Sequence, residues 1–182
     1  MIDARMDEAA VRLCGEADVA TIVEIINDAA EAYRGVIPAD RWHDPYMPEA
    51  ELRREIAGGV VFWGCEAAGR LVGVMGLQNV KDVTLVRHAY VRASDRRRGI
   101  GSRLMVALYG MSERPTLIGT WEAATWAIDF YKRHGFRQVD RETTKRLLGT
   151  YWSIPPRQVD TSVVLADERW WREAAGSDGR PA

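Results

Sequence analysis

The sequence predicts an α/β protein with one mixed β-sheet and helices on both sides of it. Apolar segments of strand length are interspersed with segments whose apolar residues recur at helical spacing. Three strands follow one another in the middle of the chain, and strand, helix, strand, helix and strand then alternate, which is typical of a mixed sheet. At 182 residues, the chain is long enough to bury a sizeable core within one domain.

The N-terminal part predicts a short strand at 11–14 and then a helix. Asp18 is a suitable N-cap for that helix. Its apolar residues recur at helical spacing and form a buried stripe of Ile22, Ile25, Ile26, Ala29 and Tyr33. Residues 34–48 contain Gly35 and several prolines, so this segment is expected to be irregular.

The next segment predicts a second helix and then consecutive strands. Pro48 suits the first turn of the helix, with Leu52 and Ile56 facing inward. A glycine pair, Gly58 and Gly59, ends it. Three strands follow, at 60–67, 71–80 and 83–91. The first two are joined by a tight turn at Ala68, Gly69 and Arg70.

The second half predicts a helix, a buried strand, another helix and a last strand. Apolar residues recur at helical spacing at Ile100, Leu104, Ala107, Leu108 and Met111. Residues 116–121 read as a buried strand, and a helix follows near 127–133. Residues 141–158 are expected to be a polar connection with one helical turn around Thr144 to Leu148. A last strand is predicted at 158–165 and a disordered tail at 174–182.

Composition and charge exclude several classes of protein. The chain is 47% apolar and 28% charged, with a net charge of −1, so no long-range attraction to nucleic acid or to an acidic membrane is built in. Cys14 and Cys65 are too few for a disulfide scaffold and show no metal-ligand spacing, so no metal site is predicted. No apolar run reaches the length of a membrane span, and the first residues lack the apolar core of a signal peptide. We therefore expect a cytoplasmic protein that binds neither membrane nor nucleic acid.

The run from Arg96 to Gly101 predicts an anion-binding site. It follows the strand at 83–91 and opens the next helix. Gly99 and Gly101 lack a Cβ, so backbone can approach a ligand closely there. The first N–H groups of a helix have no intrahelical partner and lie at the positive end of its dipole, where a phosphate is bound by backbone.

A second motif lies about thirty residues downstream, and together the two resemble the GNAT superfamily of acyl-CoA N-acyltransferases. Arg96, Gly99 and Gly101 match the family's pyrophosphate signature. Phe130-Tyr131 and Gly135-Phe136 match its second signature, in the expected order and on the expected elements. The resemblance covers roughly 10–166, which we expect to be one domain, with 167–182 as a partly disordered extension.

The resemblance implies a mostly antiparallel sheet with splayed central strands, helices on both faces, and acetyl-CoA held between the strands at 83–91 and 116–121. Backbone of Tyr90 and Val91 would pair with the pantetheine amides, as a strand edge pairs with a peptide. The implied pyrophosphate contacts are Arg96, Arg97, Arg98, Gly99, Ile100, Gly101 and Ser102. The implied contacts near the thioester are Ala124, Ile128 and Tyr131. Dimers are frequent in the family, so a homodimer is an option.

Transfer of an acetyl group to an amine needs a proton acceptor and a proton donor. In many family members the tyrosine of the second signature protonates the departing thiolate, which suggests Tyr131 here; the alternative is that Tyr131 only packs beside the cofactor. A glutamate is common in the family near the position of Arg87, which cannot act as a base. Glu122 and His88 are therefore the candidate bases. The alternatives are that His88 is structural, as a lone strand histidine commonly is, and that the amine is deprotonated through ordered water. Ala124 stands where the family often has asparagine.

The segment 33–48 is expected to line the acceptor site, as the corresponding loop does in the family. Its candidate substrate contacts, together with Arg87, are Tyr33, Trp42, His43, Asp44 and Tyr46. His43 and Asp44 could orient or deprotonate an amine. Alternatively, Trp42 and Tyr46 pin the loop to the core while His43 and Asp44 are solvated. Loops on a rigid scaffold often carry specificity.

Two functions of different class fit these motifs. The first is an enzyme that moves an acetyl group from acetyl-CoA to an amine of a small molecule, peptide or protein, by direct attack on the thioester in a ternary complex. The second is a non-catalytic module that binds CoA or acyl-CoA. The replaced glutamate and asparagine favour the module, whereas Tyr131 and the intact glycine loop favour the enzyme. The short arginine cluster of Arg92 and 96–98 is a weak footprint for nucleic acid in a chain of net negative charge.

Overall fold

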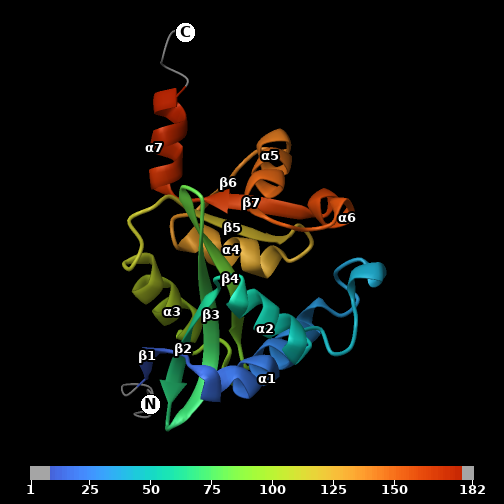
Figure 1. The fold of residues 1–182 in the computed structure, drawn as a ribbon, viewed down its shortest axis with the longest axis vertical. Helices are drawn as coiled ribbons and strands as arrows, with labels where there is room; N and C mark the ends of the chain where they lie inside the picture. Colours follow the sequence, from blue (N-terminus) through green and yellow to red (C-terminus); the bar gives the residue numbers. More distant parts are fainter. Residues whose placement is uncertain (1–8, 178–182) are drawn as a thin grey trace. The chain divides into compact units, whose positions relative to one another are not determined.

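The computed structural model, whose helices and strands are labelled in Figure 1, describes residues 9–177. The chain divides into two compact units. Unit 1 comprises Met1–Gln78 and Arg87–Met111, and unit 2 comprises Asn79–Val86 and Ser112–Ala182. The strands are β1 (Ala10–Leu13), β2 (Val61–Ala67), β3 (Arg70–Val80), β4 (Val83–Val91), β5 (Thr116–Trp121), β6 (Arg137–Gln138) and β7 (Ser162–Ala166). The α-helices are α1 (Val19–Ala30), α2 (Glu49–Ala57), α3 (Ile100–Tyr109), α4 (Thr125–Arg133), α5 (Arg141–Tyr151), α6 (Pro156–Asp160) and α7 (Glu168–Ser177).

The strands form a seven-stranded sheet in the order β1-β2-β3-β4-β5-β7-β6. β4 pairs with β5 in parallel, whereas β1–β2, β2–β3, β5–β7 and β7–β6 pair antiparallel. The predicted α/β class with a mixed, mostly antiparallel sheet is therefore confirmed.

Unit 1 places helices on both faces of its strands. The buried stripe of α1, with Ile22, Ile25 and Ile26, packs in one cluster with Phe62 and Val74. Gly73 precedes Val74 and so faces the opposite side of β3, because side chains alternate along a strand. There a Cβ on Gly73 would lie 2.8 Å from Ile100 Cγ2 at the start of α3. α1 and α3 therefore cover opposite faces, as predicted.

Unit 2 contains β5, β6, β7, the first part of β4 and the helix α5, which is longer than the single helical turn expected from the sequence. Residues 141–158 were expected to be mostly irregular, but α5 and α6 occupy most of them. The Asp140 side chain accepts a hydrogen bond from the Thr143 N–H and so caps α5. Leu147 and Leu148 are buried in one cluster with Leu117, Val164 and Ala166. Apolar contact with the strands therefore stabilises a helix whose sequence looks polar.

Other boundaries also differ from the prediction. The last strand begins at Ser162 rather than at 158, because 158–160 belong to α6. Ile56 was expected to face inward but is 37% exposed, and Met111 lies beyond α3 and is 50% exposed. α7 continues through Ser177, where a disordered tail was expected; the rest of that tail, 178–182, lies outside the described residues.

Candidate functional site

Two residues just before α3 have left-handed backbone. Gly99 is the N-cap of α3 with φ of 77°, and the preceding Arg97 has φ of 62°. A Cβ on Gly99 would meet no heavy atom within 4 Å, so its backbone conformation, and not lack of space, favours glycine here. The N–H groups of the first turn of α3 follow directly. This arrangement has the geometry of an anion site at a helix N-terminus.

The segment before α3 is anchored through Asp95. Its buried carboxylate accepts hydrogen bonds from Arg70 at 3.0 Å, from Arg98 at 3.0 Å and from Ser94 at 2.8 Å. Burial opposes the charge of Asp95, but these donors outweigh it and lower the pKa of the carboxyl. The carboxylate therefore stays ionised at neutral pH and holds the loop.

The three consecutive arginines of the loop have different environments. Arg96 donates to the Ala29 carbonyl in α1 at 2.8 Å, and Arg98 is paired with Asp95. Arg97 is exposed and makes no ion pair or hydrogen bond to any of the residues 9–177. Of the three, Arg97 is thus the cation with most freedom to meet a ligand.

The C-terminal end of β4, which leads into this loop, packs tightly against its neighbours in unit 1. A Cβ on Gly73 would lie 3.2 Å from both the Tyr90 carbonyl oxygen and Val91 Cγ2. The Tyr90 ring meets Tyr33 edge to face, with centroids 6.3 Å apart. Tyr90 and Val91, the residues expected to pair with pantetheine, are therefore held by close contacts within unit 1.

Arg87 and His88 share a carboxylate that the sequence analysis did not identify. Glu55 Oε2 lies 2.6 Å from an Arg87 guanidinium nitrogen and 3.3 Å from His88 Nε2. Arg87 also donates to Gln78 Oε1 at 2.8 Å. Glu55 lies three residues after the buried Leu52 on α2, so helical spacing alone places it on the inward face. That spacing was the signal available in the sequence.

The residues expected to contact the acceptor form an aromatic cluster. Tyr46 lies at ring-centroid distances of 5.8 Å from Tyr33, 5.4 Å from Trp42 and 6.0 Å from His43. His43 Nδ1 lies 2.7 Å from the Pro45 carbonyl oxygen, and Asp44 pairs with Arg34 at 3.3 Å. Burial, followed by the proximity of Tyr46, raises the pKa of Tyr33, so its hydroxyl stays protonated.

The other predicted site residues belong to unit 2. Glu122 is exposed just after β5, and its backbone N–H donates to the Thr161 carbonyl. Ala124, the N-cap of α4, is buried together with Ile128 and Tyr131. Tyr131 is 8% exposed, and its carbonyl accepts the N–H groups of His134 and Phe136. The end of α4 therefore fixes the backbone of Tyr131.

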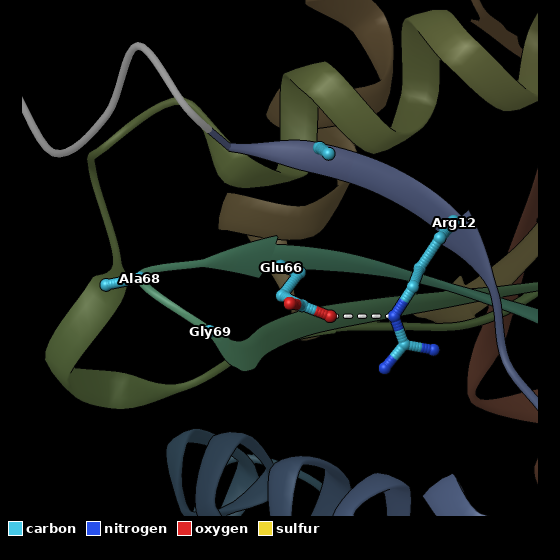
Figure 2. Close-up of a pocket in the computed structure, with 5 residues that line it drawn as sticks. Arg12, Glu66, Ala68 and Gly69 are labelled. Atoms are coloured by element: carbon cyan, nitrogen blue, oxygen red, sulfur yellow. Dashed lines mark hydrogen bonds and ion pairs between the residues drawn. The ribbon is translucent and has the colours of Figure 1, made fainter.

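A cavity of about 320 Å³ lies beside β1 and the turn between β2 and β3 (Figure 2). Arg12 lines it and is paired with Glu66 at 2.8 Å and with Asp18 at 2.9 Å. The hydrogen bonds from Arg12 and from the Gly15 N–H lower the pKa of Asp18 to about 2. Both charged residues of the lining, Arg12 and Glu66, are thus engaged in ion pairs.

Within residues 9–177, no group of three or more His, Cys, Asp or Glu side chains could hold a metal ion. None of the helices in the same part of the chain is long and apolar enough to cross a membrane.

Comparison with known proteins identifies the family. The model of the acetyltransferase (GNAT) domain matches residues 20–148, which is more than half of the chain. The chain therefore belongs to the GNAT family of acetyltransferases. No curated protein matches the sequence.

Solved structures are similar in fold at low sequence identity. PaiA N-acetyltransferase from Thermoplasma acidophilum, solved with coenzyme A, has a TM-score of 0.67 at 15% identity, over 88% of this chain and 98% of that one. A GNAT-family acetyltransferase from Staphylococcus aureus has a TM-score of 0.65 at 17% identity, over 87% and 98%. The ribosomal-protein-S18-alanine N-acetyltransferase of Escherichia coli has a TM-score of 0.62 at 14% identity, over 87% and 92%.

Proposed function

We propose that this protein transfers an acetyl group from acetyl-CoA to an amine of a small molecule, peptide or protein. The amine nitrogen attacks the thioester carbonyl directly in a ternary complex. The new N–C bond forms, the C–S bond breaks, and the products are an amide and the free thiol of CoA. Membership of the GNAT family supports the reaction class. The observation that carries the proposal is the glycine-capped start of α3, whose left-handed Gly99 leaves the helix N–H groups open to a pyrophosphate.

We assign cofactor binding to the residues that the family motifs indicate. The start of α3, from Arg96 to Ser102, binds the pyrophosphate, mainly through backbone N–H groups. Backbone of Tyr90 and Val91 pairs with the pantetheine. Asp95 supports this assignment, because it fixes the loop before α3 in one conformation.

The chemistry requires two proton transfers. Tyr131 donates a proton to the CoA thiolate as the C–S bond breaks, since a thiol with an ordinary pKa near ~8.5 leaves more easily when protonated. His88 or Glu122 accepts the proton that the amine loses. The aromatic cluster of Tyr33, Trp42 and Tyr46, with His43, Asp44 and Arg87, contacts the acceptor.

Thermal unfolding with and without acetyl-CoA tests the proposal first, with free CoA and ATP as controls. A ligand at about 100 times its Kd adds ~2.7 kcal/mol to the free energy of unfolding. For a chain of this size, the expected rise in Tm is roughly 5–10 °C. A rise with both CoA species and not with ATP supports the cofactor site. No rise with either contradicts it, and binding without turnover of any amine would identify a CoA-binding module instead.

Arg97→Ala is expected to weaken CoA binding in a salt-dependent way. Arg97 is the exposed arginine of the loop that makes no ion pair among the described residues, so it acts on bound phosphate through its charge. One exposed charge contact is worth at most ~1 kcal/mol, so the Kd should rise by about three- to fivefold at low salt. Added salt should reduce that difference by screening.

Titration calorimetry at low and high ionic strength measures the effect. Arg172→Ala is the matched control, because it removes the same charge from an exposed position on α7. Equal CoA affinity of Arg97→Ala and wild type at low salt would exclude a role for Arg97.

A further inference from the structure

His88 lies beside a carboxylate that comes from another element of unit 1. Its Nε2 is 3.3 Å from Glu55 Oε2, and its ring stacks on Phe62 with centroids 5.7 Å apart. The His88 side chain is 14% exposed and that of Glu55 is 23% exposed. The distance is at the long end for a hydrogen bond, but contacts of this kind often tighten when substrate is bound.

Glu55 occupies a position where a carboxylate is unfavourable without partners. It lies in the last turn of α2, near the negative end of the helix dipole. Burial also opposes its charge, but the hydrogen bond with His88 and the charge of Arg87 outweigh burial and lower the pKa of Glu55. Glu55 is therefore ionised at neutral pH, and its partners offset the cost of placing the charge there.

The ionised carboxylate determines which nitrogen of His88 carries the proton. A carboxylate can only accept hydrogen bonds, so the neutral imidazole must donate Nε2–H to Glu55. Its lone pair is then on Nδ1. No group among residues 9–177 forms a hydrogen bond with this second ring nitrogen. Nδ1 is thus in the form required of a proton acceptor.

The backbone of His88 is also unusual for a strand residue. His88 has φ of 50°, in the left-handed region, which is unfavourable for a residue other than glycine. Surrounding structure must hold such a residue in place. The Glu55 carboxylate and the Phe62 ring are two contacts that can do so.

We propose that Glu55 is a positioning residue that fixes the ring and tautomer of His88, so that His88 Nδ1 accepts the proton of the attacking amine. The inference rests on the proposed function and deepens it by choosing His88 over Glu122. The ammonium form of the acceptor gives one proton to Nδ1, and the freed lone pair forms the N–C bond; the second proton that this nitrogen loses on becoming an amide balances the proton that the departing thiolate takes up. The resulting imidazolium is stabilised by Glu55 and returns the proton to solvent after the thiol leaves.

NMR of the histidine side chains tests the pair without any acceptor. In the wild type, we expect a ring N–H proton of His88 that is shifted downfield and slowed in exchange by Glu55. The signal should be lost in Glu55→Gln and retained in Glu49→Gln, which removes a carboxylate from an exposed ion pair of the same helix. It should also persist in Arg87→Gln, which breaks the neighbouring ion pair and leaves the His88 contact. Loss in Arg87→Gln as well, or persistence in Glu55→Gln, would overturn the proposal.

Two acceptors of similar size test the role of the pair in proton transfer. The ammonium form of ethylamine needs help to lose its proton, whereas 2,2,2-trifluoroethylamine is already neutral at neutral pH. For Glu55→Gln we expect kcat with ethylamine to fall about tenfold or more. A general base accelerates a reaction by ~10²–10⁴-fold, and a misplaced base loses part of that acceleration. kcat with trifluoroethylamine and the KM for acetyl-CoA should change little. Glu49→Gln should match the wild type with both amines.

The outcomes separate this inference from the proposed function. Equal losses with both amines would mean that Glu55 has a structural role only and would overturn the inference, although acetyl transfer would still stand. Absence of a thermal shift of the wild type with acetyl-CoA would contradict the proposed function itself. The NMR signal of the pair does not depend on that result.

Discussion

Tyr131→Phe is expected to lower kcat by about 100-fold or more, because a general acid contributes ~10²–10⁴ to a rate. The affinity for acetyl-CoA should change by less than about tenfold, the value of one ordinary hydrogen bond. The variant keeps the ring, which lies 5.2 Å from the Phe130 ring and 6.4 Å from the Phe136 ring, so the end of α4 should remain intact. The hydroxyl is the only group removed, and its loss acts on the departure of the thiolate.

Steady-state kinetics and calorimetry measure the two quantities separately. Tyr151→Phe is the matched control, because it removes the hydroxyl that bonds to Asp82 at 2.8 Å elsewhere in unit 2. That control should keep the wild-type kcat. Equal kcat of Tyr131→Phe and wild type would show that Tyr131 only packs beside the cofactor, and an equal loss of kcat and of acetyl-CoA affinity would show that its role is binding.

The sequence predicted the start of α3 well because its determinants are local. Gly99 follows a strand and opens an amphipathic helix, and the structure gives it the left-handed backbone that a glycine is suited to adopt. The two signature motifs predicted the family on the same grounds. Few long-range contacts were needed for either conclusion, because the first motif resides in one strand–turn–helix segment and the second at the end of α4 and in the turn before β6.

The partner of His88 could not be predicted in the same way. Glu55 and His88 are 33 residues apart, and only the packing of α2 brings them together. The family pattern predicts a glutamate on β4, near the position of Arg87. In this protein, the carboxylate near that position belongs to Glu55 of α2. α5 was missed for a related reason, since its cap at Asp140 is local but its buried leucines are recognisable only against the strands of unit 2.

Asp95→Asn is the second substitution with a large expected effect. Asp95 holds two guanidinium groups and one hydroxyl, and the variant removes the charge that attracts them. Arg70 and Arg98 are 55% and 35% exposed, so water partly replaces the lost contacts. We therefore expect a loss of about 1–3 kcal/mol in the free energy of unfolding, with Tm lower by roughly 3–10 °C. Affinity for CoA should fall about tenfold, or ~1.4 kcal/mol, because the loop before α3 loses its anchor.

The loss of stability caused by Asp95→Asn should be smaller at acid pH than at neutral pH. The pKa of Asp95 is lowered in the folded protein, so its contribution to stability is complete above the ordinary aspartate pKa of about 3.8 and is lost as pH falls below it. The difference in stability between wild type and Asp95→Asn should therefore shrink in acid.

Asp18→Asn is the matched control for Asp95→Asn: it breaks the pairing with Arg12 in the same unit, away from the loop. That variant should lose stability and keep CoA affinity, because Asp95 pairs with Arg98 beside the start of α3 and Asp18 does not. An equal loss of CoA affinity in both variants would contradict a role of Asp95 in CoA binding.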